Sequence, residues 1–152
     1  MRVKQSSECN RMSLCLPALS VNEGVARSAV AAFCAQLGPT VTELADIKCA
    51  VSEAVTNCIV HAYRGTVGPI YITVVLCRDG RLRVVIKDKG CGIVDVAQAR
   101  EPLFTTDAAH ERSGMGFTVM ENFMDGLKVH SRVGRGTVVV MTKRVGARPQ
   151  KE

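Results

Sequence analysis

Two segments in the first half of the chain repeat their apolar residues about every four positions, which is the period of one helix face. The first predicts a helix over 21–37 that ends at Gly38-Pro39, with Ser20 or Asn22 as its N-terminal cap. The second predicts a helix over 42–63. The residues expected on the buried faces are Val25, Ala29, Phe33 and Leu37 in the first helix, and Leu44, Ile47, Val51, Val55 and Ile59 in the second.

After Gly68 the apolar residues change to a period of two, which is typical of β-strands. A similar alternation near the start of the chain stops at Pro17 and predicts a short edge strand. A third helix is expected where Phe117, Met120 and Met124 fall on one face. The expected strands cover 12–16, 70–77, 82–88, 127–133 and 137–143.

This order of elements predicts an α+β fold, a two-layer α/β sandwich with three helices on one face of a mainly antiparallel sheet. The length of 152 residues is typical of one domain, so we expect a single domain over 1–152. Short disordered ends are expected at about 1–9 and 146–152. About twenty residues after Gly92 lack periodicity, and long irregular segments of this kind often form functional lids.

Composition narrows the class of protein. Hydrophobic residues make up 47% of the chain, but no apolar run approaches the ~20 residues of a membrane-spanning helix. The net charge of +6 favours an anionic partner. Aromatic residues, at 4%, are too few for a base-stacking nucleic-acid surface, so we expect an anionic small ligand or an acidic protein partner. The polar N-terminal stretch lacks the apolar core of a secretory signal, so we expect a cytoplasmic protein.

The seven cysteines are not arranged as a metal or redox site. No two of them are two or three residues apart, which is the spacing that zinc sites and redox dithiols use. Cys34, Cys49 and Cys58 have apolar helical neighbours, and we interpret them as small buried hydrophobic residues.

Three polar clusters interrupt the apolar pattern. Glu53 and Asn57 are four residues apart and therefore adjacent on one helix face. They form either a solvated face or a site where Asn57 binds magnesium and Glu53 accepts a proton. Asp88 ends a strand and is followed by Gly90 and Gly92. This is either an ordinary turn or a carboxylate that a flat ligand can approach to donate an amino hydrogen.

The third cluster is Gly114-Met115-Gly116, preceded by Arg112 and Ser113, at the start of the third helix. It is either a flexible entry to the helix or a phosphate site built from backbone amides and an arginine. Neither a Walker phosphate loop nor a dinucleotide-binding fingerprint is present.

The order of these clusters resembles the GHKL, or Bergerat-fold, ATPases. They occur as Glu-x-x-x-Asn on a helix, Asp-x-Gly-x-Gly after a strand, a lid, a Gly-x-Gly helix entry and a late Gly136-Thr137. Three longer stretches, at 100–106, 111–117 and 120–125, are similar to the anti-sigma F factors of spore-forming bacteria, a family of serine kinases. The resemblance covers residues 14–143.

The resemblance implies a set of functional residues. Glu53 would be the catalytic base, Asn57 the ligand of Mg²⁺, Asp88 the acceptor for the adenine amino group, and Arg27 a contact to a protein partner. The remaining residues implied to bind ATP are Gly90, Gly92, Thr105, Thr106, Arg112, Ser113, Gly114, Met115, Gly116 and Thr137. Ala62 follows His61 where glycine is usual in the family.

The resemblance also implies a function. The protein would bind and inhibit sigma factor F and, as an ATP-dependent serine kinase, phosphorylate an anti-anti-sigma factor. A homodimer is implied as well, without direct contact to nucleic acid or membrane. Three alternatives stay open: an ATPase clamp of the same fold without a protein substrate, a module that binds ATP but performs no chemistry, and an anti-sigma kinase of a general stress response.

Overall fold

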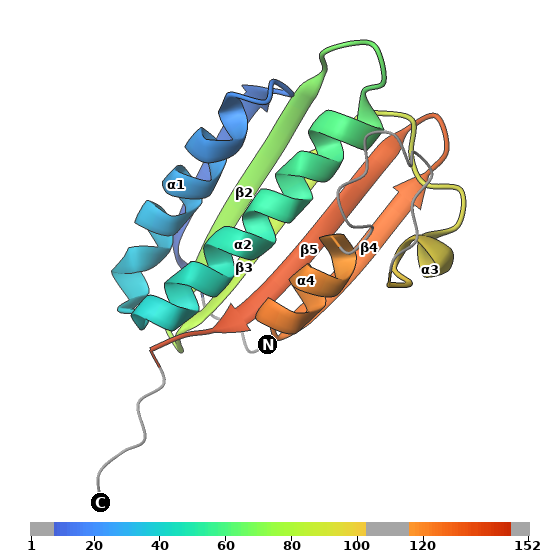
Figure 1. Ribbon diagram of the computed structural model, residues 1–152. Helices are drawn as coiled ribbons and strands as arrows, with labels where there is room; N and C mark the ends of the chain where they lie inside the picture. Colours follow the sequence, from blue (N-terminus) through green and yellow to red (C-terminus); the bar gives the residue numbers. More distant parts are fainter. Residues whose placement is uncertain (1–7, 103–115, 147–152) are drawn as a thin grey trace, which may run out of the picture.

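The computed structural model describes residues 8–102 and 116–146, which form one five-stranded sheet covered by helices on one face (Figure 1). The strands are β1 (Glu8–Pro17), β2 (Pro69–Cys77), β3 (Arg81–Asp88), β4 (Gly126–Arg132) and β5 (Gly136–Arg144). The helices are α1 (Asn22–Cys34), α2 (Val41–Asn57), α3 (Val96–Ala99) and α4 (Gly116–Phe123). A 3₁₀ turn (Ala35–Leu37) follows α1, and a π-helical turn (Cys58–Ala62) follows α2.

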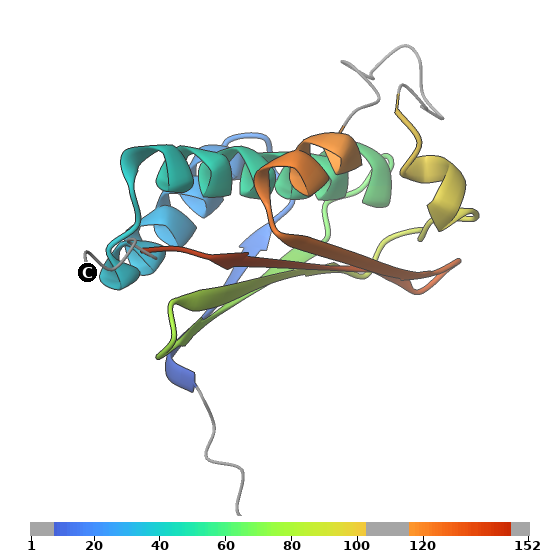
Figure 2. The same ribbon diagram turned by 90° about the horizontal axis from the view of Figure 1, so that it is seen from below.

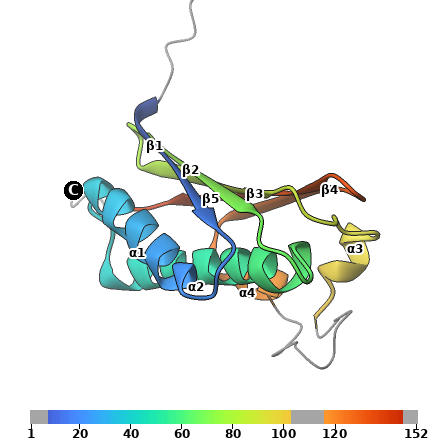
Figure 3. The same cartoon turned by 90° about the horizontal axis from the view of Figure 1, so that it is seen from above.

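The sheet has the order β1-β2-β3-β5-β4, and every neighbouring pair of strands is antiparallel. Helices α1, α2 and α4 lie on the same side of it, as the side view shows (Figure 2). The short helix α3 lies beyond the sheet's β4 side, which is clearest from above (Figure 3). The expected α+β sandwich with three helices on one face is therefore confirmed. Within the described ranges, no helix is long and apolar enough to cross a membrane.

Helix α2 is the central helix of the layer and contacts both α1 and α4. Its buried side consists of Ile47, Ala50, Val51, Ala54 and Val55. They pack against the inward-facing residues of β2 and β3, of which Ile72 and Val84 are fully buried. This packing fixes the position of the far end of α2, where Glu53 and Asn57 are located.

A capping box defines the start of α2. The Thr40 hydroxyl accepts a hydrogen bond from the Glu43 amide (3.1 Å), and the Glu43 carboxylate accepts one from the Thr40 amide (2.9 Å). The same Glu43 oxygen also accepts the amide of Gly146, at 3.3 Å. The chain after β5 is thus tied to the N-terminus of α2.

Helix α1 differs from the prediction in its cap and in its buried face. Neither Ser20 nor Asn22 caps it, because the Asn22 side chain donates instead to the carbonyl of Pro17 (3.0 Å). The buried residues are Ala26, Val30, Ala31 and Cys34, while Val25 is 51% exposed. The buried face of α1 is therefore displaced by one position along the sequence from the predicted face, because α1 packs on the sheet and on α2 through its smaller residues.

Two smaller expectations were also wrong. The aperiodic segment after Gly92 contains α3, which the Asp95 carboxylate caps by accepting the Gln98 amide at 3.0 Å. Cys49 is exposed, because it lies on the outer side of α2, whereas Cys34 and Cys58 are buried as expected.

Removing the capping hydroxyl should destabilise the fold. We expect Thr40→Ala to lower the free energy of unfolding by about 1 kcal/mol, because the Glu43 amide at the helix start loses its acceptor. Urea denaturation followed by circular dichroism measures this change. The control is Thr42→Ala at an exposed position two residues later, and an equal loss in both variants would contradict the role of the cap.

Candidate functional site

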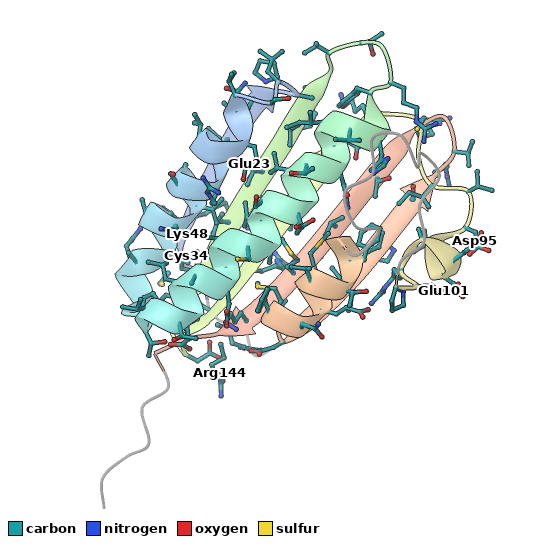
Figure 4. All side chains as sticks on the ribbon, in the orientation of Figure 1. Glu23, Cys34, Lys48, Asp95, Glu101 and Arg144 are labelled. Atoms are coloured by element: carbon teal, nitrogen blue, oxygen red, sulfur yellow. The ribbon has the colours of Figure 1, made fainter. Side chains whose placement is uncertain are left out.

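A cavity of about 490 Å³ lies between the end of α2, the π-helical turn, the loop after β3, the start of α4 and β5. Five of the residues singled out in the sequence line it: Asn57, Asp88, Gly92, Gly116 and Thr137. They come from four separate parts of the chain, and the antiparallel order of the sheet brings them together. The short helix α3 borders the same cavity, where Figure 4 labels its capping residue Asp95.

Asp88 is the buried carboxylate of this cavity, with only 6% of its surface exposed. Its Oδ1 accepts the backbone amides of Gly90 (2.9 Å) and Thr137 (3.2 Å). Burial raises the pKa of Asp88, and these two amides together with the thiol of Cys58 oppose that rise. Because both amides bind Oδ1, Oδ2 keeps more acceptor capacity for a ligand.

The loop after β3 can take its path only because glycines occupy it. A Cβ on Gly90 would lie 2.3 Å from the carbonyl oxygen of Ala62, and the next amide, that of Cys91, donates to this same oxygen at 2.9 Å. On the other side, Gly136 has a φ of +126°, and a Cβ there would lie 2.1 Å from the Asp88 carbonyl oxygen. The backbone on both sides of Asp88 is therefore closely packed.

Thr137 belongs to a small hydroxyl network behind the cavity. Its hydroxyl is 2.8 Å from that of Ser131, which also donates to the Gly136 carbonyl (3.1 Å) and accepts the amide of Ile93 (2.7 Å). This network links β4, β5 and the loop after β3. It fixes the position of Thr137 next to Asp88, and no sequence pattern indicates the role of Ser131.

Glu53 and Asn57 lie together at the start of α4. A Cβ on Gly116 would be 3.3 Å from both the Glu53 Oε2 and the Asn57 Oδ1 atoms, so α4 begins directly against these two side chains. Both residues are partly buried, which excludes the fully solvated face that the sequence left open.

These residues are compatible with a magnesium ion that is bound mainly through phosphates. In the described ranges, no group of three or more His, Cys, Asp or Glu residues could hold a metal ion. Magnesium in nucleotide sites needs only one or two protein oxygens, since phosphates and water complete its shell. Asn57 offers such an oxygen at the cavity wall.

Several predicted site residues lie either outside the described residues or outside this cavity. Thr105, Thr106, Arg112, Ser113, Gly114 and Met115 lie outside the described residues. Arg27 is described but is not part of the cavity. It lies on α1 with 43% of its side chain exposed, 3.5 Å from the carboxylate of Glu23.

Sequence reasoning missed Tyr63, which positions the loop after β3. Its hydroxyl donates to the Pro69 carbonyl (2.6 Å) and accepts the Lys89 amide (2.6 Å). The sequence predicted only that a helix ends near this residue. The cavity also includes His61, Arg64, Ile93 and Phe117, whose types and spacing carry no recognisable signal.

Comparisons with known proteins agree with this arrangement. Residues 16–143 match the family described as the histidine kinase-like ATPase domain. The anti-sigma F factor of Caldanaerobacter subterraneus subsp. tengcongensis is 54% identical over 137 residues, which cover 90% of this chain and 95% of that protein. The anti-sigma F factor of Geobacillus sp. (strain WCH70) is 55% identical over 135 residues, 88% of this chain and 92% of that protein.

A solved structure shows the same fold. The crystal structure of the RsbU and RsbW domains of Rv1364c from Mycobacterium tuberculosis superimposes with a TM-score of 0.68 at 22% sequence identity. The match covers 93% of this chain but 34% of that longer one.

Replacing the buried carboxylate of Asp88 should weaken nucleotide binding but leave the stability of the unliganded protein unchanged. If Asp88 accepts the adenine amino group, as the family resemblance implies, we expect Asp88→Asn to weaken ATP binding by about 1.5 to 3 kcal/mol through loss of one charge-assisted hydrogen bond. The amide oxygen can still accept from Gly90 and Thr137, so the unliganded protein should keep its stability. Calorimetry and thermal unfolding measure the two effects, and equal ATP affinity would contradict this role of Asp88.

The raised pKa of Asp88 predicts a pH dependence. On acidification Asp88 takes up a proton at a higher pH than an exposed aspartate does, so ATP affinity should fall earlier. The effect on the free energy of unfolding has the opposite sign. Because the pKa of Asp88 is higher in the folded than in the unfolded protein, protonation of Asp88 stabilises the folded state. This stabilisation is fully present below the unfolded pKa and is lost as the pH rises through the folded pKa.

Titration of ATP affinity by calorimetry from about pH 8 down to about pH 4, near the pKa of an exposed aspartate, tests this expectation. Asp88→Asn is the matched control, because it removes the ionisable carboxyl and keeps every other side chain of the cavity. An identical pH profile for both proteins would show that Asp88 is not responsible.

Proposed function

Because the chain belongs to the histidine kinase-like ATPase family and, within it, to the anti-sigma F factors, we propose that it is an ATP-dependent serine kinase that also inhibits sigma factor F. Its phosphate acceptor would be a serine of an anti-anti-sigma factor. The observation that best supports this proposal is that Asp88 and Asn57 line one cavity rather than separate surfaces, and that Gly116 of the same cavity lies against Glu53.

The adenine end of the site is built around Asp88. Its Oδ2 would accept the amino group of the base, while the amides of Gly90 and Thr137 support the carboxylate and Gly92 lines the cavity beside it. A carboxylate at this position favours a base edge that donates a hydrogen over one that presents an oxygen. The phosphates would extend toward Gly116 and the residues Thr105, Thr106, Arg112, Ser113, Gly114 and Met115.

The reacting end of the site is built around Glu53 and Asn57. Asn57 would hold the magnesium ion, which supplies neutralisation of phosphate charge when bound. Glu53 would accept the proton of the incoming serine hydroxyl. The N-terminus of α4, at Gly116, begins directly against both side chains, and a helix N-terminus favours a bound phosphate. Positioning and electrostatics provide most of the catalysis in phosphoryl transfer.

The partner surface is proposed to include the outer side of α1. Arg27 is half-exposed there, and its ion pair with Glu23 is anchored because the Ser52 hydroxyl of α2 donates to the same Glu23 oxygen. Arg27 would contact a protein partner by exchanging this exposed ion pair for an acidic group of the partner. We also propose that the protein acts as a homodimer.

Phosphoryl transfer is tested by incubating the protein with γ-labelled ATP, magnesium and the anti-anti-sigma factor. We expect label on a serine of the partner, and a reduction of at least tenfold in Glu53→Gln, because a general base contributes roughly 10²- to 10⁴-fold. Nucleotide affinity should change little in this variant, since Glu53 is assigned to the serine and not to the base.

The matched control is Glu101→Gln, which removes one negative charge from an exposed residue. Release of free phosphate without labelled serine would contradict the kinase and favour the ATPase clamp. Unchanged transfer in Glu53→Gln would remove Glu53 from the mechanism.

A further inference from the structure

The two oxygens of Asp88 have different surroundings. Oδ1 accepts two backbone amides, whereas Oδ2 has a single protein neighbour within hydrogen-bonding range among the described residues, the Sγ atom of Cys58 at 3.7 Å. The oxygen with acceptor capacity left for a ligand is therefore the one that the thiol contacts. That contact comes from the helix layer, whereas both amides come from the sheet and the loop after β3.

Cys58 is well placed to act as a donor. It is the first residue of the π-helical turn, it is 4% exposed, and it lines the same cavity as Asp88. Burial, followed by the nearby charge of Asp88, raises the pKa of the Cys58 thiol, so the sulfur keeps its proton. A protonated thiol is a weak donor, and a buried carboxylate is the strongest acceptor it could meet.

Geometry explains why one extra donor matters here. Rotation about the Cβ–Cγ bond moves both carboxylate oxygens together, and the two amides on Oδ1 already resist it. The Cys58 thiol adds a third restraint, on Oδ2 and from the helix layer. The remaining acceptor capacity of Oδ2 is then available to a ligand in the cavity that Asp88 and Cys58 both line.

We propose that Cys58 is a positioning residue for base recognition: its thiol donates to Oδ2 of Asp88 and orients this oxygen toward the exocyclic amino group of a bound purine. This inference rests on the proposed ATP site. It also extends the interpretation of Cys58 as a buried hydrophobic residue, because its sulfur both packs in the core and binds the carboxylate.

The test compares two nucleotides in four proteins. The ligands are ATP and purine riboside triphosphate, which lacks the 6-amino group, and the proteins are the full chain, Cys58→Ala, Cys58→Ser and Cys34→Ala. Cys34 is a matched control because it is also a fully buried cysteine with a raised thiol pKa, about 12. It lies in α1, on the opposite side of the molecule from Asp95 of the cavity lining (Figure 4).

We expect Cys58→Ala to bind ATP about 2- to 5-fold more weakly, as for the loss of one weak hydrogen bond, and to bind the analogue almost unchanged. Cys58→Ser should recover most of the preference for ATP, because a hydroxyl also donates. Cys34→Ala should keep the full preference even if its thermal stability falls. Isothermal titration calorimetry gives the affinities, and thermal unfolding shows that each variant is folded.

Two contrary results can be distinguished. If the unmodified chain prefers ATP over the analogue but Cys58→Ala keeps the same preference, or loses affinity for both ligands equally, the inference is overturned while the ATP site stands. If the unmodified chain does not prefer ATP, the assignment of Asp88 to the adenine amino group fails, and the role of Cys58 fails with it.

Discussion

A carboxylate that is almost fully buried, Asp88, is the feature on which the rest of this site depends. Burying a charge is costly unless hydrogen bonds compensate it. Here the compensation comes from two backbone amides, which require Gly90 and Thr137 to approach the same oxygen from different segments. Such an approach is possible only where glycines remove side chains, so the glycines near Asp88 and the carboxylate form one structural unit.

The second constraint is the contact between α2 and α4. Gly116 lets α4 begin against Glu53 and Asn57, and the packing of α2 on the sheet sets where these two side chains lie relative to Asp88. The same helix continues into the π-helical turn, which carries Cys58 into contact with Asp88. The core packing of a single helix thus connects the two ends of the cavity.

Much of this could be predicted from the sequence, for identifiable reasons. The strands and α2 have strong periodicity. The spacing of Glu53, Asn57 and Asp88 left a solvated face and an ordinary turn open, and their functional roles came from the family resemblance. The buried face of α1 was displaced by one position, because small residues such as Ala26 contribute little to an apolar pattern. Ser131, Tyr63 and Cys58 act through contacts between residues distant in the sequence, and the local pattern around each gives no indication of those contacts.

The most direct test of this account is a crystal structure of the protein with magnesium and a non-hydrolysable ATP analogue. The account predicts that the adenine amino nitrogen lies about 2.7 to 3.2 Å from Oδ2 of Asp88. It also predicts that the Asn57 side-chain oxygen lies about 2.1 Å from the metal ion. A base bound away from Asp88, or a metal ion held without Asn57, would contradict it.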